Sequence, residues 1–169
     1  KHIVDVGGGV GSLLLTIIKK NPNLRGTLFE LPHVVSHAKD FIEDQDVLKR
    51  IRIIAGTFFE TIPEGGDLYM MKSILHCWDD ENSVKILQNI RKVLPPDGEL
   101  MIIETIIKND NEPSIGKMTD VYMMVGLSGR ERTKEEYQVL LERANFKLER
   151  IVPTVSPLSI LVAEPVRNN

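Results

Sequence analysis

Short apolar runs alternate with longer segments of helical periodicity over most of the chain. Runs rich in β-branched and aliphatic residues lie at 2–6, 27–29, 51–55, 68–71 and 100–104. Segments with helical spacing lie at 12–20, 34–41, 81–93 and 134–144. Because strands that alternate with helices form parallel sheets with helical layers, this order predicts an α/β fold with five parallel strands.

The helix expected at 81–93 illustrates the periodicity. Val84, Leu87 and Ile90 are spaced by three residues and place their side chains on one apolar stripe. The sequence PPDG at 95–98 then ends the helix and turns the chain into the next strand.

The pattern changes after Thr133. Glu136 follows this threonine at the spacing of a capping box, which predicts a helix N-terminus. Two strand-like runs at 146–152 and 159–163 are then joined by a short link that contains the sequence PTVSP. Such a link is too short for a crossover helix, so we expect the two strands to form an antiparallel pair at the sheet edge.

The polar stretch 108–118 is expected to be the longest loop. It contains Pro113 and Gly116 and follows a predicted strand. The loops at the carboxyl ends of the strands are where an open α/β sheet places its ligand contacts.

A glycine-rich turn joins the first strand to the first helix, with the sequence VDVGGGVG at 4–11. A side chain at Gly7 or Gly9 would block a ligand or require a backbone conformation that only glycine adopts cheaply. The turn amides and the helix N-terminus offer donors to a polar or anionic ligand. We therefore expect a cofactor here; the alternative is a tight turn that binds nothing.

Two classes of cofactor use such a turn. The dinucleotide fingerprint requires glycine or alanine three positions after its second glycine, where this chain has Ser12. The pattern that is present, Asp5-x-Gly7-x-Gly9-x-Gly11, resembles the first motif of class I methyltransferases that use S-adenosylmethionine.

Glu30 ends the second predicted strand. In nucleotide-binding α/β folds a carboxylate at this place accepts hydrogen bonds from ribose hydroxyls. The position suits S-adenosylmethionine and NAD equally, and its alternative interpretation is an exposed charge at a strand end.

The composition mainly excludes classes of partner and site. The chain has 169 residues, of which 42% are hydrophobic, enough for one core, so we expect one domain over residues 1–169. A net charge of −3 gives no general attraction to nucleic acid, and no apolar run reaches membrane-spanning length. Cys77 is the only cysteine, which excludes an intramolecular disulfide, and ligand spacing suggests no metal. These features predict a cytoplasmic protein with neither nucleic acid nor membrane as partner.

Further motifs follow the glycine turn in order: LPHVV at 31–35, DLYMMKSILHCWDD at 67–80 and GRERT at 129–133. Together they closely resemble the O-methyltransferase family that includes plant caffeate, flavonoid and isoflavone enzymes and their bacterial relatives. The resemblance extends from Val4 to Ala163. It implies a Rossmann-like class I methyltransferase fold, a doubly wound sheet of five parallel strands followed by an antiparallel C-terminal pair, with S-adenosylmethionine as cofactor.

The resemblance also implies a base and two carboxylates. The matching base is His76, because an imidazole that titrates near neutrality can take the proton of a hydroxyl that attacks the sulfonium methyl. Glu104 and Glu131 match the carboxylates that flank it; such a group fixes the tautomer and stabilises the imidazolium. The alternatives are a surface loop histidine for His76 and a surface ion pair with Arg130 or Arg132 for Glu131.

Cofactor contacts are assigned by the same resemblance. Glu30 holds the ribose, Phe58 lies against adenine and Lys72 supplies a further contact. Trp78 helps to wall the cofactor and substrate region, with a simple core role as its alternative. The full set of expected cofactor residues is Asp5, Gly7, Gly9, Gly11, Glu30, Thr57, Phe58, Lys72 and Trp78.

Three positions depart from the commonest family pattern. Glu30 replaces an aspartate, and its extra methylene requires a small shift. Thr57 replaces an aspartate that accepts a bond from the adenine amine, and a hydroxyl accepts it more weakly. Cys77 replaces the aspartate that often follows the base and helps to hold the substrate hydroxyl. These departures leave open a cofactor-binding domain with a regulatory or structural role and no turnover.

Members of the family carry an N-terminal helical domain that forms a swapped dimer and closes over the substrate. The first predicted strand begins at residue 2, so we expect this domain to be absent and a homodimer to require it. The sequence as a whole predicts an S-adenosylmethionine-dependent O-methyltransferase that acts on a small, hydroxylated, aromatic metabolite. An NAD-dependent oxidoreductase is the competing enzyme class.

Overall fold

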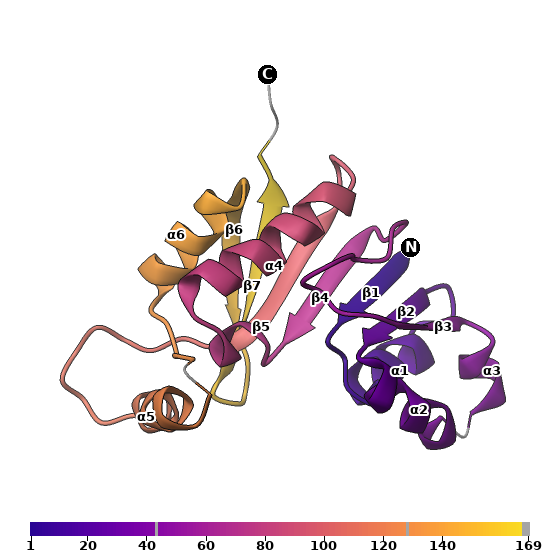
Figure 1. Ribbon diagram of the computed structural model, residues 1–169, viewed down its shortest axis with the longest axis horizontal. Helices are drawn as coiled ribbons and strands as arrows, with labels where there is room; N and C mark the ends of the chain where they lie inside the picture. Colours follow the sequence, from indigo (N-terminus) through magenta and orange to yellow (C-terminus); the bar gives the residue numbers. More distant parts are fainter. Residues whose placement is uncertain (43, 128, 167–169) are drawn as a thin grey trace.

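One seven-stranded sheet runs through the molecule, in the strand order β3-β2-β1-β4-β5-β7-β6 (Figure 1). The computed structural model describes residues 1–42, 44–127 and 129–166, and the side chains of residues 39 and 40 are outside the description. The predicted domain, 1–169, therefore ends in residues that lie outside the described ones. The strands are β1 (His2–Val6), β2 (Arg25–Glu30), β3 (Ile51–Ala55), β4 (Leu68–Lys72), β5 (Glu99–Thr105), β6 (Phe146–Pro153) and β7 (Leu158–Pro165).

Pairing in the sheet confirms the predicted fold class. Strands β1 to β5 pair in parallel, whereas β7 pairs antiparallel with both β5 and β6. The strand order reverses between β1 and β4, and in open α/β sheets ligands bind at the carboxyl ends of the strands beside such a reversal. The topology therefore places the predicted glycine turn, which follows β1, at a favoured ligand site.

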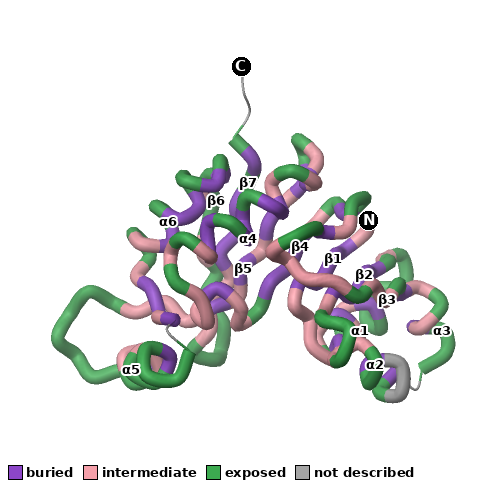
Figure 2. The backbone as a smooth tube through the Cα atoms, in the orientation of Figure 1, coloured by how far each residue is buried: buried purple, intermediate pink, exposed green. Residues whose placement is uncertain are grey.

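Helices cover both faces of the sheet. Alternate strand residues point to opposite faces, so Ile3 of β1 joins a core with α1, α2 and α3, whereas Val4 and Val6 join the larger core with α4 and α6 (Figure 1). Buried residues follow the central strands, and α5 is largely exposed (Figure 2). The helices are α1 (Ser12–Lys20), α2 (Pro32–Phe41), α3 (Gln45–Leu48), the 3₁₀ turn η1 (Leu75–Cys77), α4 (Asp80–Val93), α5 (Ile115–Leu127) and α6 (Lys134–Arg143).

The bounds expected from the sequence agree with these elements to within two residues at each end. The predicted capping box is also present, because the Thr133 hydroxyl accepts the Glu136 N–H at 3.2 Å and the Glu136 carboxylate accepts the Thr133 N–H at 2.8 Å. This cap fixes where α6 begins and therefore where the GRERT segment ends.

Two helices were not predicted. The expectation of a loop over 108–118 is wrong at its end, because α5 begins at Ile115. Gly116 and Gly126 weaken the helical signal there, yet Gly116 lets the helix pack against Thr105 and Ile107. The short α3 begins at a cap in which Asp44 accepts two backbone N–H groups, a local signal that periodicity does not reveal.

Candidate active site

The glycine turn after β1 adopts the backbone that the sequence predicted. Gly7, Gly9 and Gly11 have φ angles of 70°, 60° and 88°, in the left-handed region that favours glycine. A Cβ atom at Gly8 would lie 2.6 Å from the Asp5 carboxylate, so this position has no room for a side chain. The turn is therefore a cradle that requires glycine. Its Gly7, Gly9 and Gly11 N–H groups already donate to Phe29, Glu30 and Gly8.

A pocket of about 520 Å³ lies over this turn. Its walls bring the turn together with Lys72, the last residue of β4. Lys72 is one of the residues that we expected from the sequence to contact the cofactor. Gly11, the N-cap of α1, follows the lining residue Val10 in the chain. The pocket is lined by Asp5, Gly7, Gly8, Gly9, Val10, Ser12, Leu13 and Lys72.

Asp5 carries a buried acid into this pocket. Its residue surface is 2% exposed, and Oδ2 has no hydrogen-bond partner among the described residues. Burial, together with the nearby Glu30 carboxylate, raises the pKa of Asp5 to about 7, and Lys72 opposes this shift. An orphaned carboxylate oxygen beside a glycine cradle fits a ligand that brings hydrogen-bond donors or positive charge.

Glu30 ties the turn to the end of β2. Its Oε2 accepts the N–H of Gly9 at 3.0 Å, and its Oε1 accepts the N–H of Leu31 at 2.7 Å. The alternative of a free exposed charge at a strand end therefore does not hold. Each oxygen keeps a lone pair for a ligand hydroxyl.

An aromatic cluster lies beside the turn. Trp78 contacts Phe59 edge to face at a centroid distance of 4.7 Å and Phe58 at 6.1 Å. A Cβ at Gly7 would be 3.6 Å from the Phe58 ring, so this ring adjoins the cradle. Trp78 also packs against the main core, as in the core role considered for it, and it does not line the pocket over the turn. The Thr57 hydroxyl accepts the N–H of Phe59 at 3.3 Å, inside its own turn.

His76 lies in η1 between two buried carboxylates. Its Nδ1 is 3.0 Å from Oε1 of Glu131 and 3.7 Å from Oε2 of Glu104. The imidazole is 14% exposed, whereas both carboxylate side chains are fully buried. His76 is thus no surface loop histidine, and the surface ion pair considered for Glu131 is also excluded.

Backbone N–H groups hold the Glu104 carboxylate, and the Asp120 side chain holds the backbone of Glu131. Oε1 of Glu104 accepts the N–H groups of Ile74 and Leu75, both at 2.9 Å. The N–H of Glu131 donates to Asp120 at 2.8 Å. The Oε2 atoms of both glutamates have no partner among the described residues. Burial raises the pKa of Glu104, and the nearby imidazole opposes this shift.

The imidazole is correspondingly basic. The Cys77 side chain, followed by the Glu131 carboxylate, raises the pKa of His76 to about 10, and burial opposes the shift. The same three side chains bring one donor atom each within 4.8 Å of one another, a spacing that a cation also fits. An imidazole and two carboxylates at these distances equally form a base and its orienting groups.

Arg132 is a site residue whose role the sequence did not reveal. It is fully buried, and its guanidinium donates to the carbonyls of Leu75 and Trp78 at 2.9 and 2.8 Å and to the Asp80 carboxylate. It thereby holds both ends of η1. The only sequence signal for Arg132 is its place in the GRERT motif. From the sequence we considered it only as a possible surface ion-pair partner of Glu131.

The glycine turn and the histidine segment meet through Ile74. A Cβ at Gly7 would lie 2.6 Å from the Ile74 side chain, and Ile74 precedes η1 directly. His76 itself does not line the pocket over the turn. The structure therefore brings the predicted cofactor residues and the predicted base to one edge of the sheet, as adjoining groups.

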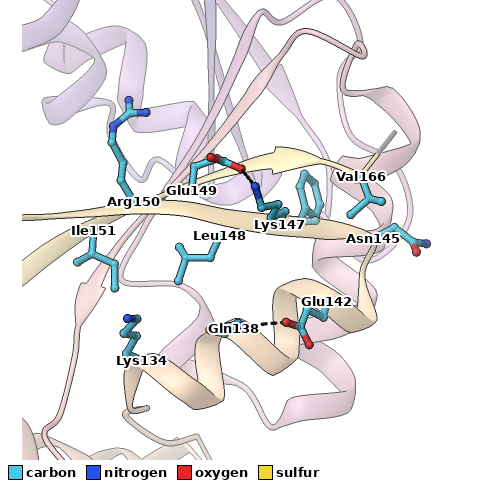
Figure 3. Close-up of a pocket in the computed structure, with 11 residues that line it drawn as sticks. Lys134, Gln138, Glu142, Asn145, Lys147, Leu148, Glu149, Arg150, Ile151 and Val166 are labelled. Atoms are coloured by element: carbon cyan, nitrogen blue, oxygen red, sulfur yellow. Dashed lines mark hydrogen bonds and ion pairs between the residues drawn. The ribbon is translucent and has the colours of Figure 1, made fainter. Parts of the chain in front are cut away.

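A larger groove of about 870 Å³ lies between α6 and the edge strand β6 (Figure 3). Its lining includes the Lys147–Glu149 pair at 2.7 Å and the Gln138–Glu142 pair at 2.9 Å. None of the predicted site residues lines it. Its paired charges and half-buried strand residues give it no catalytic group.

The chain is similar in sequence to known O-methyltransferases. The family model described as "O-methyltransferase domain" matches residues 1–147. The chain is 40% identical over 166 residues to the phenazine O-methyltransferase PhzM of Lysobacter antibioticus, covering 98% of this chain and 49% of that protein. It is 39% identical over 151 residues to the mitomycin biosynthesis 6-O-methyltransferase of Streptomyces lavendulae, covering 89% and 43%. The chain thus spans about half the length of the curated relatives it matches.

A solved structure extends the likeness to three dimensions. NcsB1, an O-methyltransferase from neocarzinostatin biosynthesis, superimposes with a TM-score of 0.89 at 29% identity, covering 98% of this chain and 49% of that one. That structure holds S-adenosylmethionine and 2-hydroxy-5-methyl naphthoic acid. Within the described ranges, no helix has the length and apolar character that a bilayer crossing requires.

Proposed function

The chain belongs to the O-methyltransferase domain family, and from this premise we propose that it binds S-adenosylmethionine over the β1 turn and methylates a hydroxyl of a small aromatic acceptor. The observation that carries the proposal is the carboxylate-held imidazole of His76 at the same sheet edge as the glycine cradle. The aromatic acceptor class is supported by the named substrates of the relatives, such as the naphthoic acid held by NcsB1.

The residues of the pocket suit this cofactor. The N-terminus of α1, which begins at Ser12 in the wall of the pocket, favours its carboxylate, and Asp5 offers an orphaned acceptor for its positive charge. Glu30 has lone pairs left for ribose hydroxyls, and the Phe58 ring adjoins the turn as an adenine wall. When bound, the cofactor supplies a methyl group on a sulfonium, which is already a good methyl donor.

His76 then acts as the base. Since Nδ1 lies 3.0 Å from Glu131, it holds the proton of the neutral imidazole, and Nε2 keeps a lone pair for the acceptor. The acceptor O–H proton moves to Nε2 while an oxygen electron pair forms the bond to the methyl carbon and the sulfur keeps the electrons of the broken bond. Glu104 and Glu131 stabilise the imidazolium that results.

The raised pKa of His76 suits a phenolic acceptor. A phenol has a pKa of about 10, close to that of the imidazole. Proton transfer between groups of matched pKa is close to thermoneutral, but His76 accepts a proton only in its neutral form. The methylation rate should therefore rise with pH up to about pH 10, where the neutral imidazole becomes the main form. Most of the remaining barrier is lowered by alignment of oxygen, methyl carbon and sulfur.

A binding and activity experiment tests the proposal. Titration calorimetry of the intact protein with S-adenosylmethionine and with NAD is expected to give binding of the first alone. In an assay with a panel of phenols, His76→Gln should lower kcat by a hundredfold or more while leaving cofactor affinity within a factor of about two, because removal of a general base costs about 10²–10⁴. Binding of NAD alone would favour an oxidoreductase, and an unchanged rate in His76→Gln would remove the base.

The remaining predictions from the sequence concern turnover, assembly and location. Thr57 and Cys77 depart from the family pattern and are the reason to test the alternative, a cofactor-binding domain without turnover. Binding of S-adenosylmethionine without methylation of any phenol would support that alternative. Homodimerisation through an N-terminal helical domain and a cytoplasmic location stay predictions, to be checked by sedimentation and by microscopy of the tagged intact protein.

A further inference from the structure

A buried amide on α4 contacts the segment that carries the Phe58 ring. Asn89 is 7% exposed, and its Nδ2 donates to the Phe58 carbonyl at 2.9 Å. Its Oδ1 accepts from the Lys92 ammonium, also at 2.9 Å. Because an ammonium only donates and a carbonyl only accepts, these two partners fix which way round the amide lies. Both ends of the Asn89 amide therefore have a partner, and one partner belongs to the predicted cofactor site.

The segment that Asn89 contacts follows β3 and has a second anchor at the end of β2. The N–H of Gly56 donates to the backbone carbonyl of Glu30 at 3.0 Å. Glu30 is the residue whose side chain has lone pairs left for ribose hydroxyls. The segment 56–58 is thus held on one side by the ribose-site glutamate and on the other by α4, with Phe58 at the end that Asn89 holds.

The Phe58 ring lies where the position of this segment matters for the pocket. A Cβ at Gly7 would be 3.6 Å from the ring. The ring also contacts Phe59 and Trp78 edge to face, at centroid distances of 5.0 and 6.1 Å. Apolar contacts of this kind have little directional preference, whereas a hydrogen bond prescribes both a distance and an angle. The bond from Asn89 therefore fixes the Phe58 backbone more closely than the packing of its ring does.

We propose that Asn89 is a positioning residue for the cofactor. By holding the Phe58 backbone it keeps the ring beside the glycine turn, where the adenine of S-adenosylmethionine would contact it. Asn89 does not line the pocket over the turn, so it acts on the cofactor through Phe58. The inference rests on the proposed function and deepens it, since it names the residue on which the adenine contact depends.

Loss of this hydrogen bond should affect cofactor binding and leave the chemical step unchanged. One hydrogen bond between neutral groups changes an equilibrium constant by about tenfold. We therefore expect the Kd of S-adenosylmethionine to rise about tenfold in Asn89→Ala and in Asn89→Asp, which keeps the acceptor for Lys92 but loses the donor to Phe58. The value of kcat at saturating cofactor should stay within a factor of about two, because His76 is held by carboxylates from other segments.

The test is a double-mutant cycle in the intact protein. Phe58→Leu removes the ring, and Asn89→Ala is measured with and without it, by calorimetry with S-adenosylmethionine and with adenosine, which carries the base but no sulfonium. If Asn89 acts through Phe58, the alanine raises both Kd values about tenfold when the ring is present and less than twofold when it is absent. Gln88→Ala is the matched control: the Gln88 amide, also on α4, donates to the carbonyl of Arg143 in α6 at 3.4 Å, and its loss should change neither Kd.

An unchanged Kd in a folded Asn89 variant, or equal effects of Asn89→Ala with and without the Phe58 ring, would overturn the inference. If neither Asn89 variant folds, a crystal structure of the wild-type protein with bound S-adenosylmethionine decides. A Phe58 ring in contact with adenine, together with Asn89 Nδ2 in hydrogen-bond distance of the Phe58 carbonyl, supports the proposal, and the loss of either contact contradicts it. Wild-type protein that does not bind S-adenosylmethionine removes the proposed function and the inference together, whereas normal wild-type binding beside unaffected Asn89 variants removes only the role of Asn89.

Discussion

Two buried carboxylates around one imidazole set the charge of the site. With His76 neutral, Glu104 and Glu131 would leave two negative charges in the core, and a proton on the imidazole compensates one of them. Because the folded pKa of His76, about 10, exceeds its ordinary value of 6.5, its contribution to stability is complete below pH 6.5. This contribution is lost as the pH rises through 10. The two carboxylates thus stabilise the imidazolium form of His76 in the folded protein.

Asp5 has the same direction of pH dependence as His76, in a lower pH range. Its folded pKa of about 7 exceeds the ordinary 3.8, so the folded protein binds more protons between these values and loses stability as the pH rises. The loss from this one group amounts to about 2.5 kcal/mol between pH 5 and pH 8. Asp5→Asn should therefore be more stable relative to wild type at pH 8 than at pH 5, by that amount, in urea unfolding curves at the two pH values.

The same substitution should weaken binding of the cofactor. A neutral amide loses the attraction of Asp5 for a sulfonium or ammonium group, and we expect the Kd of S-adenosylmethionine to rise about tenfold, measured by calorimetry. Asp97→Asn, at an exposed turn, is the matched control and should change neither quantity. Equal pH dependence of stability in Asp5→Asn and wild type would contradict the raised pKa.

Single residues were predictable where a motif names them. The resemblance to the O-methyltransferase family identified His76, Glu104 and Glu131, and the structure places them together. Arg132 was not identified, because its role depends on which atoms lie nearby after folding. A buried arginine and a surface arginine have the same appearance in a sequence.

At the level of elements, the segment between α5 and α6 holds η1 by its backbone. The N–H of Arg130 donates to the carbonyl of His76 at 3.0 Å, and Arg132 holds the carbonyls on either side. Gly129 lies directly against the same backbone, where a Cβ would overlap the His76 carbonyl and contact the backbone of Cys77. The position of His76 therefore depends on a glycine that has no functional side chain.

Gly129→Ala tests this dependence. The methyl group must displace the η1 backbone, since a carbonyl oxygen cannot be repacked as a flexible side chain can. We expect a loss of about 2 kcal/mol in the free energy of unfolding and at least a tenfold lower kcat, with an unchanged Kd for S-adenosylmethionine. The measurements are urea unfolding, a methylation assay and calorimetry.

Gly126→Ala is the matched control for that variant. A Cβ at Gly126 meets no atom within 4 Å, and alanine is favoured over glycine in a helix by up to about 1 kcal/mol. It should leave kcat unchanged and stabilise the protein slightly. Equal effects of the two alanines would show that Gly129 matters only for its backbone freedom.

Sequence periodicity was sufficient for elements that bury one face and insufficient for α5. In α4 the buried residues recur at helical spacing and the predicted bounds agree to one residue. In α5 only Gly116 and Met123 are buried, while Met118 and Val125 are 76% and 85% exposed. A helix with apolar residues on its exposed face lacks the polar stripe by which a sequence pattern identifies a helix. The predicted loop over 108–118 therefore ran into the first residues of α5.

At the scale of the whole molecule, the order of strands and helices was predictable because it follows from local patterns and general rules of α/β topology. The convergence of two distant segments followed from the same rule, since parallel strands end at one edge. Contact distances did not follow from it. Packing in three dimensions places Ile74 against Gly7. It also places His76 beside the pocket without making it part of the lining.

The placement of this pocket predicts how the cofactor affects the whole fold. The walls come from β1, the glycine turn, α1 and β4, on both sides of the point where the strand order reverses. Residues of β1 and β4 contribute to both cores, so opening the pocket disrupts both. We therefore expect bound S-adenosylmethionine to stabilise the protein against global unfolding, by about 2.7 kcal/mol at a free concentration of 100 times its Kd.

Trp78, the only tryptophan, reports this effect. It lies in the aromatic cluster beside the turn and packs against the main core, so its fluorescence should change once on cofactor binding and again on unfolding in urea. The midpoint of the second change should rise with the concentration of S-adenosylmethionine and be insensitive to NAD. A midpoint that S-adenosylmethionine leaves unchanged, in a protein that calorimetry shows to bind it, would mean that the pocket opens without unfolding the sheet.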